Sequence, residues 1–353
     1  MAASGRVLAQ AVRAHVRYAQ LLGDSEYWTL LNLKSTSEIT RFLQGTKAYE
    51  GVFANFVPAH THRSDFECAL HLAMAEETAV FVNSLDSGAH KSFLACMLGR
   101  FEAAQIKTVF RFLNSGFPSK AVLRQFPCFD VDFSALDGCD SYAAILEALK
   151  DSKYYEILAE PAAKLAQGTE VSLFNLETAI DRFSEAELFG ALQLLDKDEQ
   201  KLLAPLFGVQ VDLVNLYTLH RCKCYYSMAA EDILRMLIPA EYLVKSEDIR
   251  AMADCSEDER QLYFKDRFPA YFKMFEDVPE VSDRELRLET AIRRCSCGEA
   301  LRLFKKGPPG FHTIVSYLML RLHETEDLTK ILEFVRYECT PRTSAKYLAH
   351  ILD

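Results

Sequence analysis

A short helical pattern occurs three times in this chain at nearly equal spacing. Each copy opens with an acid, has an amide or a carboxylate three positions later, and continues into apolar residues. The copies are Glu102 to Arg111, Asp212 to Arg221 and Glu324 to Glu333. The polar positions Gln105 and Asn215 are 110 residues apart, and Asn215 and Asp327 are 112 apart. A period of this length is that of a small domain, not of a solenoid repeat.

The spacing predicts three similar modules. A chain of 353 residues is long for one hydrophobic core, since domains usually hold roughly 100 to 200 residues. Proline and glycine between periodic segments, at Gly116 to Pro118 and at Pro239, indicate the boundaries. The expected modules are residues 1–116, 117–238 and 239–353.

The periodicity of the copies favours helix. In the first copy Ile106, Val109, Phe110 and Leu113 fall at i, i+3, i+4 and i+7, and the third copy repeats this spacing from Leu328 to Val335. The middle copy has Leu216 and Leu219 and then polar residues, so the row of apolar residues along its helix is narrower or rotated. The alternation from Phe129 to Phe133 is the only clear strand signal, and one strand cannot make a sheet. The predicted fold class is therefore all-α.

Further elements accompany the pattern. A turn and a short helix are expected after each copy, at Pro118 to Leu123, Ser227 to Leu234 and Thr340 to Leu348. Leu43 to Tyr49 resembles Leu149 to Tyr155, 106 residues later. The nearest approach to a third copy of this second element is Phe268 to Tyr271.

Six residues of the repeated pattern are candidate contacts between helices or with a partner protein. They are Gln105, Arg111, Asp212, Asn215, Arg221 and Asp327. One interpretation places such side chains on solvated helix faces, with acids near helix starts. The other is that the polar positions form hydrogen bonds between helices at equivalent places in each module, which recurrence favours.

Charge and cysteine content limit the partners and the compartment. Residues 117–238 carry 11 Lys and Arg against 19 Asp and Glu, and no third of the chain is strongly basic. This weighs against nucleic acid and lipid headgroups as partners and favours proteins. Ten dispersed cysteines indicate reduced thiols and a cytoplasmic protein. The most apolar stretch, Leu202 to Leu219, is interrupted by Asp212, so no membrane span is expected.

Catalytic and metal chemistry find little support in the residues. The sequence has no P-loop, no dinucleotide-binding glycine motif and no nucleophile elbow, so neither catalytic residues nor a nucleotide or other cofactor are expected. His60 and His62, Cys222 and Cys224, and Cys295 and Cys297 are pairs one residue apart, which suits tetrahedral zinc poorly. Buried or half-exposed thiols are the simpler interpretation.

Several of these stretches together are similar to one known family. Val211 to Tyr226, followed by Leu237 to Pro239, resembles the central signature of a V-type and A-type ATPase family, known as the C subunit in prokaryotes and the d subunit in eukaryotes. Val12 to Tyr49 resembles the opening of that family, and His323 to Ile331 resembles its closing signature. Gln105 and Asp327 depart from the Asn usual in the family, and Glu333 stands where the first two copies have Arg.

The resemblance implies a specific architecture and role. Members of this family are all-helical, with three similar modules around a pseudo-threefold axis in the shape of a funnel. They are peripheral to the membrane, sit on its proteolipid ring, receive the central shaft of the soluble ATPase head and turn as part of the rotor without binding nucleotide. The resemblance does not distinguish proton from sodium transport, or ATP synthesis from hydrolysis. The alternatives are a helical-repeat adaptor outside any ATPase and a metal-dependent enzyme using the His60 region.

Overall fold

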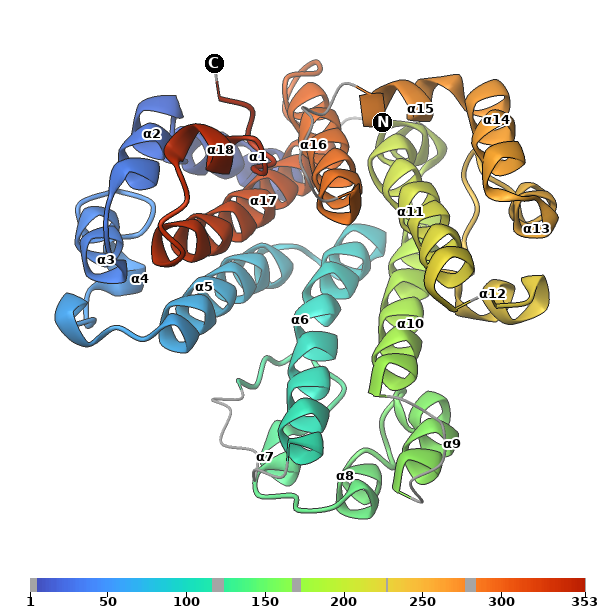
Figure 1. Cartoon of the computed structure of the whole chain (residues 1–353). Coiled ribbons are helices and arrows are strands. Elements are labelled where there is room, and N and C mark those ends of the chain that lie inside the picture. Colours follow the sequence, from blue (N-terminus) through green and yellow to red (C-terminus); the bar gives the residue numbers. More distant parts are fainter. Residues whose placement is uncertain (1–4, 116–123, 167–172, 227, 277–283, 353) are drawn as a thin grey trace.

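Helices form all the regular structure in the described part of the chain (Figure 1). The computed structural model describes residues 5–115, 124–166, 173–226, 228–276 and 284–352. No strand occurs within these ranges, which confirms the all-α prediction. The stretch at Phe129 to Phe133 is an irregular segment that leads into a short helix, with Val131 and Phe133 buried.

Six long helices form a closed circuit in which each packs against the next, and the last packs against the first. In this order they are α5 (Arg63–Ser84), α6 (Ala89–Asn114), α10 (Leu173–Gln193), α11 (Lys197–Tyr226), α16 (Arg284–Phe304) and α17 (Phe311–Arg336). A seventh helix, α1 (Gly5–Tyr18), lies against α17 and α5 (Figure 1). The helices α6, α11 and α17 carry the three copies of the repeated pattern.

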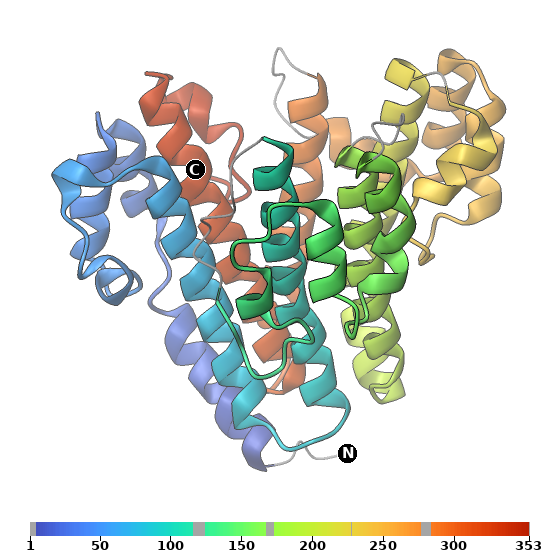
Figure 2. The ribbon, with the colours of Figure 1, turned by 90° about the horizontal axis from the view of Figure 1, so that it is seen from below.

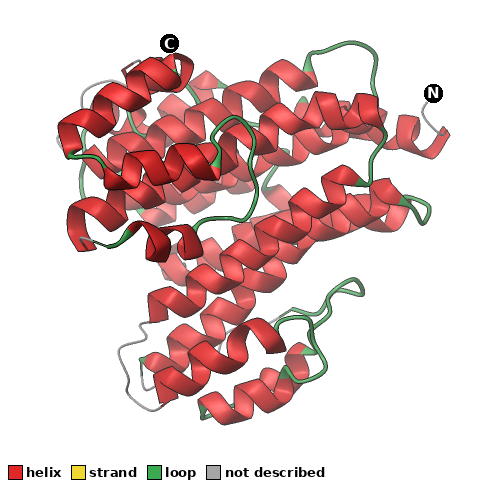
Figure 3. Ribbon diagram, turned by 90° about the vertical axis from the view of Figure 1, so that its right-hand side faces the viewer, coloured by secondary structure: helices red, strands yellow, loops and turns green. Residues whose placement is uncertain are grey.

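Short helices lie in three groups outside this circuit, and Figures 2 and 3 show them flanking the long helices. The first group, with the C-terminal α18, lies beside α17, the second beside α6 and α10, and the third beside α11. The first group holds α2 (Asp24–Asn32), α3 (Thr36–Gln44), α4 (Glu50–Phe53), η1 (Pro58–His60) and α18 (Pro341–Ala345). The second group holds α7 (Phe133–Leu136), α8 (Tyr142–Ala148) and α9 (Tyr155–Ala166). The third group holds α12 (Ala230–Met236), α13 (Ser246–Asp254), α14 (Glu257–Arg267) and α15 (Pro269–Glu276).

Local sequence explains where several helices begin. The Thr340 hydroxyl accepts a hydrogen bond from Thr343 N, and Pro341 occupies the first turn of α18, as the sequence predicts. The expected helix after the middle copy forms as α12, without a side-chain cap at Ala229. Ser227 and the segment from Pro118 to Leu123 lie outside the described residues.

Two of the turns that connect the long helices depend on glycine. Gly88, between α5 and α6, has φ +145°, and Gly307, between α16 and α17, has φ +71°. Residues with a Cβ rarely adopt these angles, so glycine permits both reversals.

The central core is shared by all six long helices. Phe93 of α6 lies 5.4 Å from Phe207 of α11 and 5.9 Å from Phe311 of α17, measured between ring centroids, and both pairs meet edge to face. The three rings are at most 2% exposed. Edge-to-face rings contribute stability beyond the area they bury, so this contact ties the three pattern-bearing helices together.

Three further buried clusters lie between each pattern-bearing helix and its group of short helices. One runs from Ala103 to Ile180, one from Leu213 to Tyr271, and one joins residues 22–70 with 328–348. Each cluster therefore combines residues from two of the expected ranges 1–116, 117–238 and 239–353. The boundary between residues 116 and 117 lies outside the described residues, and the division into modules stays a prediction.

One described helix, α11, is long and apolar enough to cross a membrane by length and composition alone. Its most apolar window has a mean hydropathy of 1.4, and half of that window is buried within the protein. The helix packs against α10, α12, α13, α16 and α17, and Asp212 in its middle is 1% exposed. This packing is that of a core helix.

Phe93→Ala tests the shared central core. Removing the ring leaves a cavity where three helices meet, so we expect the free energy of unfolding to fall by about 3–5 kcal/mol, measured by urea denaturation. Leu194→Ala is the control, because this side chain is 67% exposed and its loss costs at most about 0.5 kcal/mol. Equal effects of the two variants would contradict a core centred on Phe93.

Candidate functional site

The acid that opens each copy of the pattern is buried. Glu102 and Asp212 are 1% exposed and Glu324 is 5% exposed. Each carboxylate accepts one or more hydrogen bonds from backbone N–H groups of a neighbouring segment and another from a buried tyrosine hydroxyl. We call these three arrangements the carboxylate clamps, and each fixes a group of short helices to a long helix.

The first clamp is built on Glu102 of α6. Its Oε1 accepts hydrogen bonds from the backbone N of Asp130 at 2.5 Å and of Val131 at 2.9 Å. Its Oε2 accepts from the hydroxyl of Tyr154 at 3.1 Å, and the Lys153 ammonium lies 3.9 Å away. The segment before α7 and the start of α9 are thereby held against α6.

The second clamp is built on Asp212 of α11. Its two oxygens accept hydrogen bonds from the backbone N of Tyr242, Leu243 and Val244 at 3.3, 2.8 and 3.1 Å. The hydroxyl of Tyr271 donates to Oδ2 at 2.8 Å. The segment before α13 and the helix α15 are thereby held against α11.

The third clamp joins the two ends of the chain. Glu324 of α17 accepts hydrogen bonds from the backbone N of Leu22 at 2.8 Å and from the hydroxyl of Tyr49 at 2.7 Å. The Arg321 guanidinium donates to Glu324 at 2.8 Å and lies 4.1 Å above the Tyr49 ring. In the first two clamps the captured segment follows the acid in sequence, whereas here it is the N-terminal segment.

The polar residue three positions after each acid adds a second contact. The side-chain amide of Gln105 bonds to both N and O of Arg124 at 2.6 and 3.1 Å. The amide of Asn215 bonds to both N and O of Ile238 at 2.8 and 3.1 Å. Each amide thus pairs with the backbone of one residue, as an adjacent strand would.

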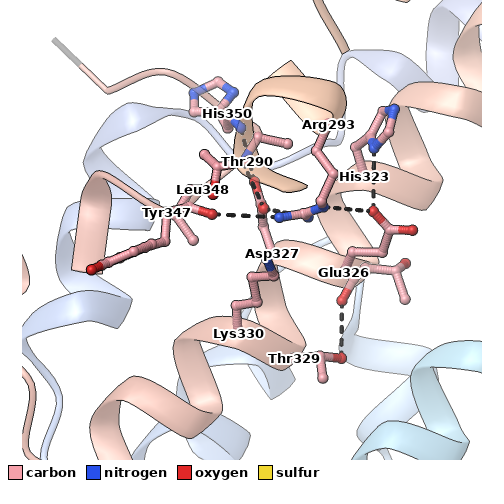
Figure 4. A network of polar contacts seen from close by, with 12 residues as sticks. Thr290, Arg293, His323, Glu326, Asp327, Thr329, Lys330, Tyr347, Leu348 and His350 are labelled. Carbon is pink, nitrogen blue, oxygen red and sulfur yellow. Dashed lines mark hydrogen bonds and ion pairs between the residues drawn. The ribbon is translucent and has the colours of Figure 1, made fainter. Parts of the chain in front are cut away.

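Asp327 takes the same position in the third copy, and Figure 4 shows its surroundings. Its two oxygens accept from the backbone N of Ala349 and of His350, both at 2.9 Å. The guanidinium of Arg293 on α16 lies 2.7 Å from Oδ1 and also reaches Glu326 at 3.0 Å. The carboxylate therefore holds the C-terminal segment while forming a buried ion pair.

Burial sets the electrostatics of the clamps. It raises the pKa of Glu102, Asp212 and Glu324, and the hydrogen bonds they accept offset part of that rise. Lys153 and Arg321 also favour the charged forms of Glu102 and Glu324. The charged form of Asp212 is stabilised by its three backbone donors and the Tyr271 hydroxyl, since no cation lies within ion-pair distance of it among the described residues.

The expected arginines play different parts. Arg111 pairs with Glu177 of α10 through two hydrogen bonds of 2.5 and 3.0 Å, and its side chain is 57% exposed. Arg221 lies over the rings of Phe174 and Tyr217, at 5.9 and 5.7 Å. Arg111 therefore joins two long helices through charge, whereas Arg221 does so through aromatic rings.

The three clamp tyrosines belong to the candidate site, and the sequence pattern identifies them only in part. The 106-residue offset pairs Tyr49 with Tyr155, whereas the structure places Tyr154 in the equivalent position. Tyr271, in the segment that comes nearest to a third copy of the second element, completes the set. Tyr154 could have been found by considering the tyrosine one residue before Tyr155, the position that the spacing from Leu149 and Ser152 indicates.

A large open groove of about 1120 Å³ lies beside α1, α4 and α5. Charges of both signs line it, including Arg13, Lys47, Asp65, Glu76 and Arg124. Such a mixed lining suits a polar protein surface better than a phosphate backbone. Within the described ranges, no three His, Cys, Asp or Glu residues gather as a metal site would require.

Comparison with known proteins identifies similar sequences. The family model described as ATP synthase (C/AC39) subunit matches residues 11–347. The C subunit of the A-type ATP synthase of Methanosarcina mazei is 26% identical over 246 residues, which are 68% of this chain and 65% of that protein. The protein of the same name from Halobacterium salinarum is 33% identical over 188 residues, 52% of each chain. That of Methanosphaera stadtmanae is 23% identical over 95% of this chain and 85% of its own length.

These matches differ in extent. The first two cover about half to two thirds of the relatives' own lengths, whereas the third covers most of both chains. The similarity therefore supports the family over nearly the whole chain and leaves activity and partners to be argued separately.

Asp212→Asn tests the second clamp. The amide has one oxygen where the carboxylate has two, and its NH₂ group faces backbone donors, so we expect the free energy of unfolding to fall by about 2–4 kcal/mol. Chemical denaturation measures the loss. Asp198→Asn, on the exposed first turn of the same helix, changes it by at most about 0.5 kcal/mol. In a double-mutant cycle, Tyr271→Phe and Asp212→Asn are expected to be non-additive, and strict additivity would argue against the clamp.

Glu326 gives the fold a pH dependence. Burial opposes its ionisation, but the hydrogen bond from His323 and the Arg293 guanidinium lower the pKa of Glu326 to about 2. Because this pKa lies below the unfolded value of 4.5, ionised Glu326 adds stability above that value, and the addition is lost as pH falls toward 2. We expect the free energy of unfolding of wild type to exceed that of Glu326→Gln by at most about 1 kcal/mol at neutral pH, since this side chain is half-buried.

Denaturation of both proteins between about pH 6 and pH 3, chosen within their folded range, measures this difference. The difference in free energy of unfolding between wild type and Glu326→Gln should shrink as the pH falls below about 4.5. The exposed Glu247→Gln variant should show no such trend. A gap that stays constant over the whole range would show that Glu326 does not act through its charge.

Proposed function

This chain belongs to the ATP synthase (C/AC39) subunit family, and on that premise we propose that it is a non-catalytic stalk subunit of a V/A-type rotary ATPase. Its role is to couple the central shaft of the soluble ATPase head to the proteolipid ring in the membrane. It turns with both as part of the rotor, and it is peripheral to the membrane on the cytoplasmic side.

The observation that carries this proposal is the set of three carboxylate clamps on one closed circuit of helices. A body that transmits torque must resist shear between the element that drives it and the element that it drives. Each clamp fixes backbone segments with charge-assisted hydrogen bonds inside a buried environment, where such bonds are strong. The circuit also joins α17 back to α5, so no helix of the six is a free edge.

The same features support the three-module architecture. The clamp acids occupy equivalent positions of α6, α11 and α17, and these helices meet at Phe93, Phe207 and Phe311. We propose that the three helices with their groups of short helices are related by a pseudo-threefold axis and form the walls of a funnel. In this proposal a module begins at the clamp helix and includes the segment that it captures, so the third module uses both ends of the chain.

The charges favour protein partners. The chain has a formal net charge of −10, and charges of both signs line the open groove. Neither feature suits nucleic acid, whose binding requires many cationic contacts to phosphates. The proposed partners are the shaft subunits and the polar loops of the proteolipid ring.

Reconstitution tests the proposed function. The purified chain should bind the shaft subunits and the detergent-solubilised proteolipid ring of the same organism, and it should bridge the two in one complex at low salt. Wild type and Asp198→Asn should behave alike. If neither partner is retained under these conditions, the rotor proposal is wrong and a helical-repeat adaptor becomes the better interpretation.

Coupling offers a sharper measurement in the assembled ATPase. Asp212→Asn loosens one wall of the coupler, so we expect less ion transport for each ATP hydrolysed, although the hydrolytic sites lie in other subunits. Ion uptake into proteoliposomes and ATP hydrolysis, measured on the same preparation, give this ratio. An unchanged ratio in a complex that is fully assembled but thermally less stable would show that the clamp serves folding only.

A further inference from the structure

An apolar pocket lies in the third group of short helices, away from the groove and the clamp oxygens. It has a volume of about 260 Å³ and lies where α11, α13, α14, α15 and α16 converge. Most of its lining is apolar, with Leu219, Met252, Phe264, Phe272 and Leu288 among the residues. Pockets for small molecules usually measure about 300–1,000 Å³, so this one suits a ligand of roughly a dozen non-hydrogen atoms.

Two arginines that line this apolar pocket each have a buried nitrogen without an acceptor among the described residues. The Nη1 of Arg260 and the Nε of Arg287 are both shielded from solvent and have no hydrogen-bond acceptor in the described part of the protein. Both residues line the pocket, although they come from different helices, α14 and α16. A buried donor without an acceptor costs free energy, and two in one pocket call for a common explanation.

The other donors of these guanidinium groups explain why the side chains stay in place. Arg260 donates through Nε to the Met252 carbonyl at 3.2 Å and through Nη2 to the Cys255 carbonyl at 3.4 Å. Arg287 donates through Nη2 to the Glu276 carbonyl at 3.4 Å. Both side chains are therefore tethered to backbone oxygens, and each keeps a buried nitrogen without an acceptor in the described ranges.

We propose that this pocket binds a small organic carboxylate with an aromatic or branched apolar body. The two carboxylate oxygens accept from Arg260 and Arg287, and the apolar body packs among the phenylalanine, leucine and methionine side chains. Guanidinium donors suit the planar carboxylate well. A phosphate fits less well, because the pocket is mainly apolar and Glu276 also lines it and would repel a second negative charge.

Calorimetric titration of the full chain with 3-phenylpropanoate tests the proposal, with 3-phenylpropanamide as the neutral probe of the same shape. We expect saturable binding of the carboxylate with a dissociation constant below about 10 mM, and binding of the amide at least about tenfold weaker. No detectable binding of the carboxylate at about 10 mM, or equal binding of both probes, would overturn the proposal.

Variants locate the site. Arg287→Gln should weaken carboxylate binding at least about tenfold and leave amide binding unchanged. Leu288→Trp, which fills the pocket, should abolish binding of both probes. Arg302→Gln is the matched control on α16, since Arg302 pairs with Glu299 outside the pocket. Retained carboxylate affinity in Arg287→Gln would overturn the assignment.

Folding must be separated from binding in these variants. Arg260→Gln should also weaken carboxylate binding, but Arg260 joins α14 to the end of α13 and its loss can destabilise the fold. Thermal unfolding of each variant, with and without 3-phenylpropanoate, distinguishes the effects: the ligand should raise the Tm of wild type and Arg302→Gln and not that of Arg287→Gln. A ligand-induced rise of equal size in all three would contradict the proposal. Binding here is independent of the shaft and ring, so failure leaves the proposed coupling role untouched.

Discussion

The fold depends on a buried carboxylate that accepts hydrogen bonds from backbone N–H groups of a distant segment. At Glu102, Asp212 and Glu324 the carboxylate replaces the hydrogen bonds that water would give to segments lying between helices. Burying a charge is costly unless it is well hydrogen-bonded, and here each acid accepts from several donors. The burial cost thereby favours one arrangement of the chain, because an arrangement without these donors leaves the acids buried and unpaired.

The sequence predicted the helices and the repeated polar positions, and it missed the contacts between residues that are far apart in the chain. The stripes from Ile106 to Phe110 and from Leu328 to Leu332 are buried, because helical periodicity is a local property. The polar position at Gln105, Asn215 and Asp327 was identifiable because it recurs. Its partners were not, since a bond to the backbone of Arg124 or Ile238 leaves no mark on the identity of those residues. Arg293 likewise carries no repeat signal, although it neutralises Asp327.

The middle copy shows how chemistry can be kept while packing changes. Its apolar stripe is interrupted at His220, and Leu216, Leu219 and Cys222 are buried in place of the regular spacing. Its acid has no neighbouring cation in the described ranges, yet it has more backbone donors than the other two. Equivalent clamps therefore fix short helices to a long helix with different combinations of charge and hydrogen bonding. The region that this copy holds is also the one that contains the apolar pocket with two arginines.

The third clamp has a consequence for the synthesis of the protein. Tyr49 and Glu324 are 275 residues apart in the chain, so an early segment to leave the ribosome contacts a partner that is made much later. At a synthesis rate of roughly 5–20 residues per second, the N-terminal segment exists without its anchor for on the order of tens of seconds. The first two clamps can close soon after their acids emerge, because the segments that they capture follow directly. The helices α2 to α4 are therefore among the segments that chaperones have to shield until α17 has been made.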